Sequence, residues 1–361
     1  MKILVIHASA GAGHFKAAEA LFNGIKKSTD HDVLLVDALD YTSSFFKNSY
    51  KGIYFFLISK MPWVWGFFFW LLDIPWLQSF VRSSRRIYNT FNANKLHRFL
   101  QEGRFDTIFM THFLPTEVAA SLKRSRRISS QLITIVTDFD VHKIWLADGI
   151  DHYAVASDWT KNKLLQLGIA QESVLVSGIP TDEKFSLTRD ISVLKRTLGL
   201  RENIFTVLVA TGSFGIGPID EIIDALSGFQ VIVVCGHNKS LFKKLSVKNY
   251  QLAKILGLVD NMHELMAVSD AMVTKPGGLS ISEALVSQLP LIFFNAIPGQ
   301  ETGNIKVLKT YGIGISGCSV KQISEELAQM KNSRDVYLTT LKKTKLLSHP
   351  SAVKDIMSLI K

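Results

Sequence analysis

Three glycine-containing loops carry the residue types that could do chemistry, and each follows a short apolar run. In the first, HASAGAGHFKAAEA (residues 7–20), Gly11 and Gly13 precede His14 at the expected start of a helix. Glycines let a ligand approach the backbone closely, and a histidine ring can accept a proton near neutral pH. We therefore interpret His14 as the catalytic residue of a ligand-binding loop.

A dinucleotide-binding loop is one alternative for this segment. Gly11-x-Gly13 would continue toward a third small residue at position 16, where this chain has Lys16, and Asp37 stands where a ribose-binding acid is expected. A bulky lysine at that position would push the helix away from the strand, which disfavours this interpretation. A histidine that caps the helix or lies on the surface is the other alternative.

The second loop, ATGSFGIGPIDE (residues 210–221), is suited to holding an anion. Successive backbone N–H groups at Gly212, Ser213, Phe214 and Gly215 could converge on a phosphate, and Pro218 suits the first turn of the helix that follows. Glycine turns after strands are common, so this loop alone does not define its ligand.

The third loop begins at residue 273 with VTKPGGLSISEAL. Lys275 offers a positive charge, Gly278 a free backbone, Ser280 a hydroxyl and Glu283 a carboxylate in the next helix. Ser280 and Glu283 have the spacing of a capping box, which alone would explain both. A carboxylate beside a helix N-terminus could also accept two ribose hydroxyls while the amides hold a diphosphate. The polar run PGQETGN adds residues suited to binding sugar hydroxyls, namely Gln300, Glu301 and Asn304.

The elements that must position these loops alternate along the chain. Apolar runs indicate strands at 2–8, 31–39, 105–113, 131–139, 151–157, 173–180, 204–212, 229–238, 253–259, 270–278 and 289–297. Helical patterns lie between them, for example at 15–27 and 193–200, which is typical of parallel sheets covered on both faces. We predict an α/β protein with two doubly wound Rossmann-like domains, 1–185 and 186–361, facing a cleft.

Composition indicates a globular protein of a reducing compartment. The chain has 361 residues, of which 47% are hydrophobic and 20% charged, and its two cysteines are too few for a disulfide framework. The amino-terminal residues enter a strand pattern at once, so no secretion signal is expected. A net charge of +10 favours anionic partners.

One segment is unusually aromatic and is followed by a basic one. Residues 45–80 hold 14 of the 37 aromatic residues, and the apolar run 61–72 is too short to cross a bilayer. Tryptophan favours the lipid headgroup region and nearby arginines favour anionic lipid. An aromatic core or dimer contact is the alternative, a homodimer stays open, and nucleic-acid binding is not expected. The residues predicted to dock on a membrane are Trp63, Trp65, Phe68, Trp70, Arg82, Arg85 and Arg86.

The chain resembles a known family over nearly its whole length. The segments HASAGAGHFKAAEAL, VTDFDVHKIW, GIPTDEKF, GSFGIGPI, CGHNKSL, GLVDNMHELMAVSDAMVTKPGG and SEALVSQLPLIFFNAIPGQETGN occur in the order found in monogalactosyldiacylglycerol synthases and processive diacylglycerol glucosyltransferases. These enzymes are similar to MurG-type glycosyltransferases. The resemblance implies a GT-B fold, with a UDP-sugar in the carboxyl-terminal domain and a lipid acceptor and membrane contact in the amino-terminal domain. It leaves open whether the last helix packs on the amino-terminal domain.

The resemblance also implies roles for individual residues. His14 would be the base, with Asp138 as the second catalytic candidate, and the sequence does not decide between them. The acceptor-binding candidates are Gly11, Gly13, His142 and Trp145. The donor-binding candidates are Gly212, Ser213, Phe214, Val259, Met262, Lys275, Gly278, Ser280, Glu283, Gln300, Glu301 and Asn304. Pro276, where the family usually has a small residue, and a serine rather than threonine at 280 are departures that affect the phosphate contacts.

The expected reaction is an inverting, metal-independent transfer of a hexose from UDP-glucose or UDP-galactose to diacylglycerol, with no cofactor. It needs a base for the acceptor hydroxyl and positive groups for the departing diphosphate. The sequence has no Asp-x-Asp motif, and Lys275 and Leu291 flank Glu283 at eight residues, where a retaining Glu-x7-Glu enzyme would have a glutamate. We expect a peripheral protein of the cytoplasmic membrane face. MurG-like transfer to a polyprenyl-linked acceptor, a UDP-sugar epimerase and a non-enzymatic UDP-sugar sensor are the alternatives.

Overall fold

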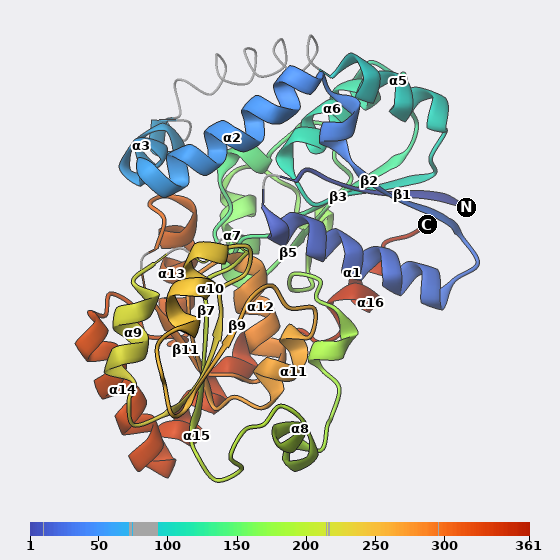
Figure 1. Cartoon of the computed structure of the whole chain (residues 1–361). Coiled ribbons are helices and arrows are strands. Elements are labelled where there is room, and N and C mark those ends of the chain that lie inside the picture. Colours follow the sequence, from blue (N-terminus) through green and yellow to red (C-terminus); the bar gives the residue numbers. More distant parts are fainter. Residues whose placement is uncertain (10, 72–73, 75–92, 214, 216, 295) are drawn as a thin grey trace. The chain divides into compact units, whose positions relative to one another are not determined.

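The protein is described by a computed structural model that covers residues 1–361 except 10, 72–73, 75–92, 214, 216 and 295 (Figure 1). Its chain divides into two compact units. The first contains Met1–Asp182, Ile297–Gly303 and Ser351–Lys361, and the second contains Glu183–Ala296 and Asn304–Pro350. The chain therefore enters the first unit again twice, at 297–303 and at 351–361.

The first unit is built on a six-stranded sheet in the order β2-β1-β3-β4-β5-β6, with parallel pairing throughout. Near-continuous apolar runs form these strands because helices cover both faces. The strands are β1 (Lys2–His7), β2 (Asp32–Asp37), β3 (Thr107–Met110), β4 (Gln131–Ile135), β5 (His152–Val155) and β6 (Val174–Val176). The α-helices are α1 (Ala12–Ser28), α2 (Ser44–Lys60), α3 (Pro62–Leu71), α5 (Asn94–Gly103), α6 (Phe113–Arg124), α7 (Asp158–Gln166) and α16 (Ala352–Met357).

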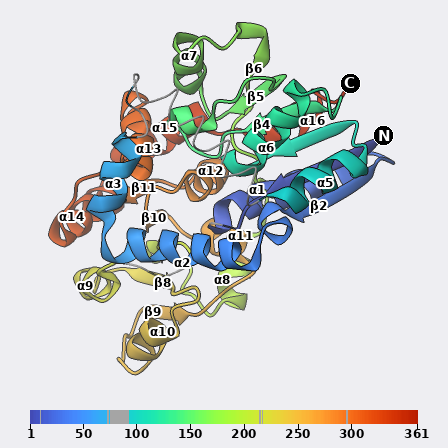
Figure 2. The ribbon, with the colours of Figure 1, turned by 90° about the horizontal axis from the view of Figure 1, so that it is seen from above.

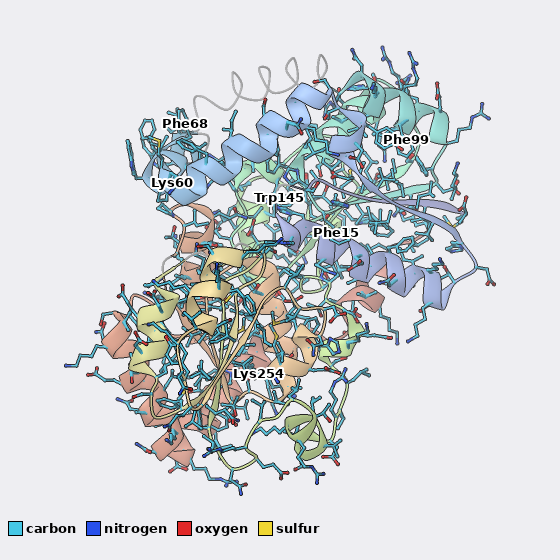
Figure 3. All side chains as sticks on the ribbon, viewed as in Figure 1. Phe15, Lys60, Phe68, Phe99, Trp145 and Lys254 are labelled. Carbon is cyan, nitrogen blue, oxygen red and sulfur yellow. The ribbon has the colours of Figure 1, made fainter. Side chains whose placement is uncertain are left out.

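Alternation along β1 divides the core of this unit into two layers. Ile3 and Val5 pack with the apolar face of α1 and with Ile356 of α16. Leu4 and Ile6 point to the other face, where α5 and α6 cover them (Figures 1 and 2). On that side Phe99, labelled in Figure 3, stacks near Tyr41 and Phe105, with ring centroids 4.2 and 5.6 Å away.

The second unit is built on a five-stranded parallel sheet in the order β11-β10-β7-β8-β9. Its strands are β7 (Thr206–Ala210), β8 (Gln230–Val234), β9 (Ala253–Leu256), β10 (Ala271–Thr274) and β11 (Leu291–Phe293). Its α-helices are α8 (Ile191–Thr197), α9 (Ile219–Ala225), α10 (Lys239–Ser246), α11 (Met262–Ala267), α12 (Gly278–Val286), α14 (Val320–Asn332) and α15 (Arg334–Thr344), and α13 (Gln300–Thr310) begins in the first unit and ends here. Short 3-10 helices complete both units at Ala38–Tyr41, Lys143–Trp145, Gln171–Ser173, Glu183–Phe185 and Lys345–Leu347.

The two parallel sheets with helices on their faces confirm the predicted α/β class. The predicted strands are all present. Two helices begin earlier than predicted, since α1 starts at Ala12 and α8 at Ile191. Within the described residues, no helix is both long enough and apolar enough to span a membrane.

Candidate functional site

The first candidate site lies at the carboxyl ends of β1, β3 and β4. The strand order places β1 beside β3. From β1 the chain connects outward to β2 on one side of the sheet, and from β3 it connects outward to β4 on the other side. Ligands of open parallel sheets bind at the carboxyl ends of the strands beside such a switch point. His14 lies in the first turn of α1, directly after β1 and its loop. Thr111 follows β3 and Thr137 follows β4, which brings both beside the histidine.

The ring of His14 is held through its Nδ1 atom. This atom is 2.8 Å from the carbonyl oxygen of Thr111 and 2.8 Å from the hydroxyl oxygen of Thr137. The Thr111 hydroxyl in turn donates to the His14 carbonyl at 2.9 Å. Because a carbonyl only accepts, Nδ1 carries the hydrogen, and the Nε2 atom of the neutral ring keeps its lone pair. The arrangement therefore presents a base.

Burial keeps this histidine neutral. Desolvation lowers the pKa of His14 to about 4, the bond to the Thr111 carbonyl raises it in part, and His7 lowers it further. The first turn of a helix also disfavours a positive charge. The neighbouring His112, whose ring centroid is 4.8 Å away, has a pKa well below its ordinary value because it is buried and lies near His14 and His7. Both rings are therefore uncharged near pH 7.

Asp138 is buried beside this histidine loop, with 5% of its surface exposed. The Gln300 side-chain amide donates to both of its carboxylate oxygens at 3.0 Å. Glu301 accepts a bond from the Ile297 amide at 2.7 Å. The structure thus places two predicted sugar ligands in the first unit, where Gln300 holds Asp138 and Glu301 closes its own turn.

The predicted acceptor residues surround the same loop. The Nδ1 atom of His142 accepts from the Ile144 amide at 3.1 Å, so this buried ring caps a short helix. Trp145, labelled in Figure 3, is buried with its ring 6.1 Å from that of His14. Gly11 is the extended residue before α1, with nothing within 4 Å of where a Cβ would lie, and Gly13 lies inside the first turn.

Asp37 is engaged in a way that disfavours the dinucleotide alternative. Its carboxylate accepts bonds from the Ser9 amide at 3.2 Å, from the Ser9 hydroxyl and from the Leu39 amide at 3.0 Å. Asp37 therefore caps the 3-10 helix that follows β2 and fixes the loop after β1.

The second candidate site lies at the carboxyl ends of β7 and β10, which are the two strands at the topological switch point of the other sheet. Here the loops after β7 and β8 interlock, because a Cβ on Gly215 would lie 2.5 Å from the Cys235 carbonyl oxygen, and one on Gly236 equally close to the Ser213 carbonyl oxygen. The Gly215 amide donates to the Gly212 carbonyl oxygen at 3.3 Å, so it closes the turn. Phe214 lies outside the described residues.

The third glycine loop leads into α12, and the start of this helix excludes the capping-box alternative for Ser280 and Glu283. The helix begins at Gly278 with Gly277 as its cap, and no side chain caps it. Ser280 is therefore the third helical residue and forms no capping box with Glu283, because the two glycines allow the helix to start earlier. Lys275 and Glu283 are both half-buried.

Asn304 is hydrogen-bonded to the backbone of this loop. The residue is fully buried, and its side-chain amide donates to the carbonyl oxygen of Pro276 at 2.9 Å. Val259 and Met262 are half-buried residues of the loop after β9 and the start of α11. Asn304 thus contacts the loop backbone, which places the predicted sugar ligand in a supporting position.

Comparison with known proteins adds the family. Residues 14–181 match the family model of monogalactosyldiacylglycerol (MGDG) synthase, and residues 206–355 match that of the glycosyltransferase family 28 C-terminal domain. A processive diacylglycerol beta-glucosyltransferase of Staphylococcus carnosus (strain TM300) is 29% identical in an alignment that covers 92% of this chain and 86% of that protein. The protein of that name from Bacillus cereus (strain G9842) is 28% identical over 87% of this chain and 81% of its own length. The two family models together match most of the chain, which is similar to these diacylglycerol glycosyltransferases over most of its length.

Solved structures share the fold of this chain. Staphylococcus aureus MnaA with UDP aligns with a TM-score of 0.65 at 14% identity, over 100% of this chain and 96% of that one. Acinetobacter baumannii MurG aligns with a TM-score of 0.60 at 12% identity, over 100% and 99%. Anabaena Alr3699/HepE with UDP aligns with a TM-score of 0.59 at 17% identity, over 99% of both chains. The predicted GT-B fold is confirmed.

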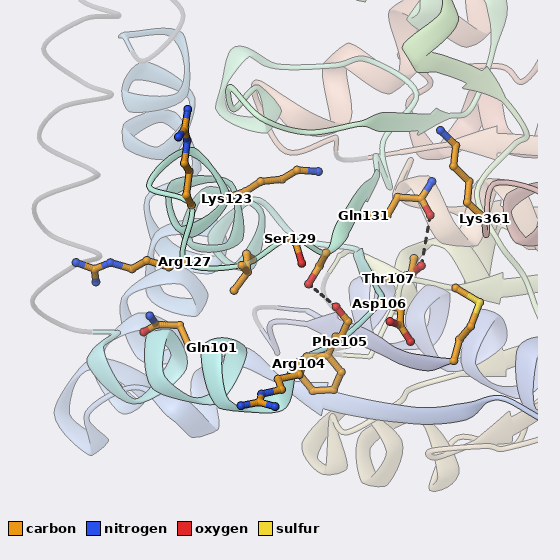
Figure 4. A pocket seen from close by; sticks show the side chains of 14 residues that line it. Gln101, Arg104, Phe105, Asp106, Thr107, Lys123, Arg127, Ser129, Gln131 and Lys361 are labelled. Atoms are coloured by element: carbon orange, nitrogen blue, oxygen red, sulfur yellow. Dashed lines mark hydrogen bonds between the residues drawn. The ribbon is translucent and has the colours of Figure 1, made fainter.

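A basic groove of about 1070 Å³ lies at the opposite edge of the first sheet, at the amino ends of β1, β3 and β4 (Figure 4). Arg104, Lys123, Arg127 and Lys361 line it, but their charged groups point in different directions in Figure 4. The sheet separates the groove from His14, so it is not the site of the chemistry.

The predicted membrane-docking residues are divided between α3 and undescribed residues. Four large side chains of α3 are more than half exposed, namely Trp63, Phe67, Phe68 and Trp70. Phe68 is labelled in Figure 3, while Trp65 is half-buried. Arg82, Arg85 and Arg86 lie outside the described residues.

Sequence reasoning missed Thr111, Thr137 and His112 as residues of the site. Each is a polar residue just after, or two residues after, a buried strand, at the sheet edge where His14 lies. This position after a strand was the available signal.

Proposed function

We propose that the protein is an inverting glycosyltransferase that transfers a hexose from a UDP-sugar to the hydroxyl of diacylglycerol. The family supports the acceptor class, and the Anabaena and Staphylococcus aureus structures that share the fold contain UDP. The observation that carries the proposal is the neutral His14, held at Nδ1 by Thr111 and Thr137 with its Nε2 atom available as a base.

The reaction follows from the position of this base. As the acceptor oxygen forms a bond to the sugar C1 atom, Nε2 of His14 takes the hydroxyl proton. The C1–O bond to the diphosphate breaks with its electron pair, so UDP leaves as an anion. His14 is the better base of the two candidates because the Gln300 amide already donates to both carboxylate oxygens of Asp138. Attack opposite the leaving group inverts the configuration at C1.

The donor would bind at the carboxyl ends of β7 and β10. Glu283 would accept the ribose hydroxyls, and the main chain at Val259 and Met262 would meet the uracil. Amides of the loop at 212–214 and of the start of α12, with Lys275 and Ser280, would stabilise the departing diphosphate. No metal or cofactor is required for these steps.

The protein would act at the cytoplasmic membrane surface. The exposed aromatic side chains of α3 suit the headgroup region, and the net charge of +10 favours anionic lipid. This placement brings the acceptor loop of the first unit to a substrate that resides in the bilayer.

The test is product analysis with anionic vesicles that contain diacylglycerol, offered with UDP-glucose, UDP-galactose and UDP-N-acetylglucosamine in turn. We expect a glycolipid from one hexose donor, with the β configuration from an α-linked UDP-sugar. A polyprenyl-linked acceptor and a soluble epimerase assay serve as parallel arms. Product only in either of those arms would contradict the proposal and support MurG-like transfer or epimerisation.

A further inference from the structure

A single glycine interrupts the bulky helix α3, whose sequence is PWVWGFFFWL. Glycine inside a helix is about 1 kcal/mol less favourable than alanine, so its presence there calls for a packing reason. A Cβ added to Gly66 would lie 2.6 Å from the Cβ of Pro298. The helix and the segment 297–303 therefore approach too closely for any side chain at position 66, as their adjacency in Figures 1 and 2 also shows.

The segment that Gly66 contacts is a firmly closed turn. The Ile297 amide donates to the Glu301 carboxylate at 2.7 Å, and the Gly299 amide donates to the Thr302 hydroxyl at 3.0 Å. The Thr302 hydroxyl donates back to the Gly299 carbonyl oxygen at 3.1 Å. These bonds join residues 297–302 into one hydrogen-bonded turn.

The other side of this turn contacts the loop that carries Asp138. Gln300 donates to both oxygens of Asp138 at 3.0 Å. A Cβ on Gly303 would lie 2.9 Å from the Asp140 carboxylate, which pairs with Lys163 at 2.5 Å. Continuous contact thus runs from α3 through the turn to residues 138–140, all within the first unit.

We propose that this turn couples lipid docking of α3 to the position of Asp138 and the loop that carries it. Gly66 allows α3 to approach Pro298 closely, and Gln300 of the same turn holds the Asp138 carboxylate. These three residues are therefore positioning residues. Seating the exposed aromatic residues of α3 in a lipid surface fixes the helix, and through the turn it fixes the loop beside His14. The turnover effect rests on the proposed function, whereas the coupling of α3 to the turn does not.

The first test compares two glycine substitutions in neighbouring helices. Gly66→Ala places a methyl group against Pro298, whereas Gly52→Ala in α2 meets nothing within 4 Å and serves as the control. At saturating vesicle concentrations, we expect Gly66→Ala to lower turnover on the order of tenfold and Gly52→Ala to leave it unchanged. Equal turnover of Gly66→Ala and wild type would overturn the inference.

A compensating pair separates the contact from general damage to the helix. The double variant Gly66→Ala/Pro298→Gly removes the clashing Cβ, whereas Gly66→Ala/Pro298→Ala retains it. We expect the first double variant to turn over at least threefold faster than the second, as coupled neighbours do in a double-mutant cycle. Equal rates of the two double variants would also overturn the inference.

Hydrogen exchange tests the coupling without turnover. In wild type, the amides of 297 and 299–303 should exchange severalfold more slowly when anionic vesicles are added, and Gly66→Ala should lose this protection. A protected turn in a wild type that makes no glycolipid would contradict the proposed function and leave the coupling standing. An exchange rate unaffected by vesicles would contradict the coupling itself.

Discussion

His14 combines two properties that a base in this reaction needs. Its neutral form is enforced by burial, and its reactive tautomer is fixed by two oxygens at Nδ1. Neither property belongs to histidine as a residue type, because a histidine in water is partly protonated near neutrality and has no preferred partner. The carboxyl ends of three adjacent strands supply both.

The lowered pKa of His14 predicts an unusual pH profile. Because the folded protein holds this ring neutral down to about pH 4, compared with 6.5 for an ordinary histidine, the acid limb of kcat/KM should fall near pH 4 to 5. The same shift makes the folded state bind fewer protons than the unfolded state between these values, so stability falls as pH drops from 6.5 to 4. Rates on vesicles, with circular dichroism at each pH, measure both. An acid limb centred at 6.5 would contradict this account.

Thr137 should position His14 through its hydroxyl. Thr137→Val removes one oxygen from Nδ1 and retains the size of the side chain, while the Thr111 carbonyl remains. We expect about a fivefold loss in kcat, corresponding to a net hydrogen bond of about 1 kcal/mol. Thr137→Ser keeps the hydroxyl and is the matched control, so a Val variant as active as the Ser variant would exclude this role.

Among the elements, the glycine loop into α12 depends on a residue 28 positions away. Buried Asn304 donates to the Pro276 carbonyl, which ties the start of α13 to the loop. The same bond holds the backbone at Pro276, the unusual proline of TKPGG.

Replacing this buried amide should destabilise the second unit and weaken donor binding. Asn304→Ala leaves the Pro276 carbonyl without this donor, at a cost of about 1–3 kcal/mol in unfolding free energy. Denaturant unfolding and calorimetric titration with UDP measure the two effects. Asn332→Ala, at the exposed end of α14, is the control. Unchanged stability and UDP affinity in Asn304→Ala would refute this supporting role.

The sequence predicted the strands well because apolar runs such as KILVIHA are buried on both faces. It placed the start of α1 too late, since Ala12, Gly13 and His14 resemble loop residues when Gly11 is not known to be the cap. It also suggested a capping box at Ser280 that an earlier helix start excludes. The partners of His14 lie 97 and 123 residues away, and only the strand order, which local patterns do not contain, brings them together.

At the scale of the whole molecule, charge and exposed aromatic side chains both favour an anionic lipid surface. Trp63 is 69% exposed on α3, so burying it in the headgroup region should contribute about 1–2 kcal/mol. Trp63→Ser should therefore weaken binding to anionic vesicles about five- to thirtyfold in co-sedimentation. Val247→Ser, at a 78% exposed residue of the other unit, is the control. Equal vesicle binding of the two variants would argue against docking through α3.

The central claim is that His14 takes the proton from the acceptor hydroxyl. The most direct measurement is the initial rate of glycolipid formation on diacylglycerol vesicles by His14→Ala, with His31→Ala as a histidine control outside the site. We predict a loss of about a hundredfold to ten-thousandfold for His14→Ala, with UDP affinity and vesicle binding unchanged, and no loss for His31→Ala. A His14→Ala variant that forms the glycolipid within a few fold of the wild-type rate would contradict the account.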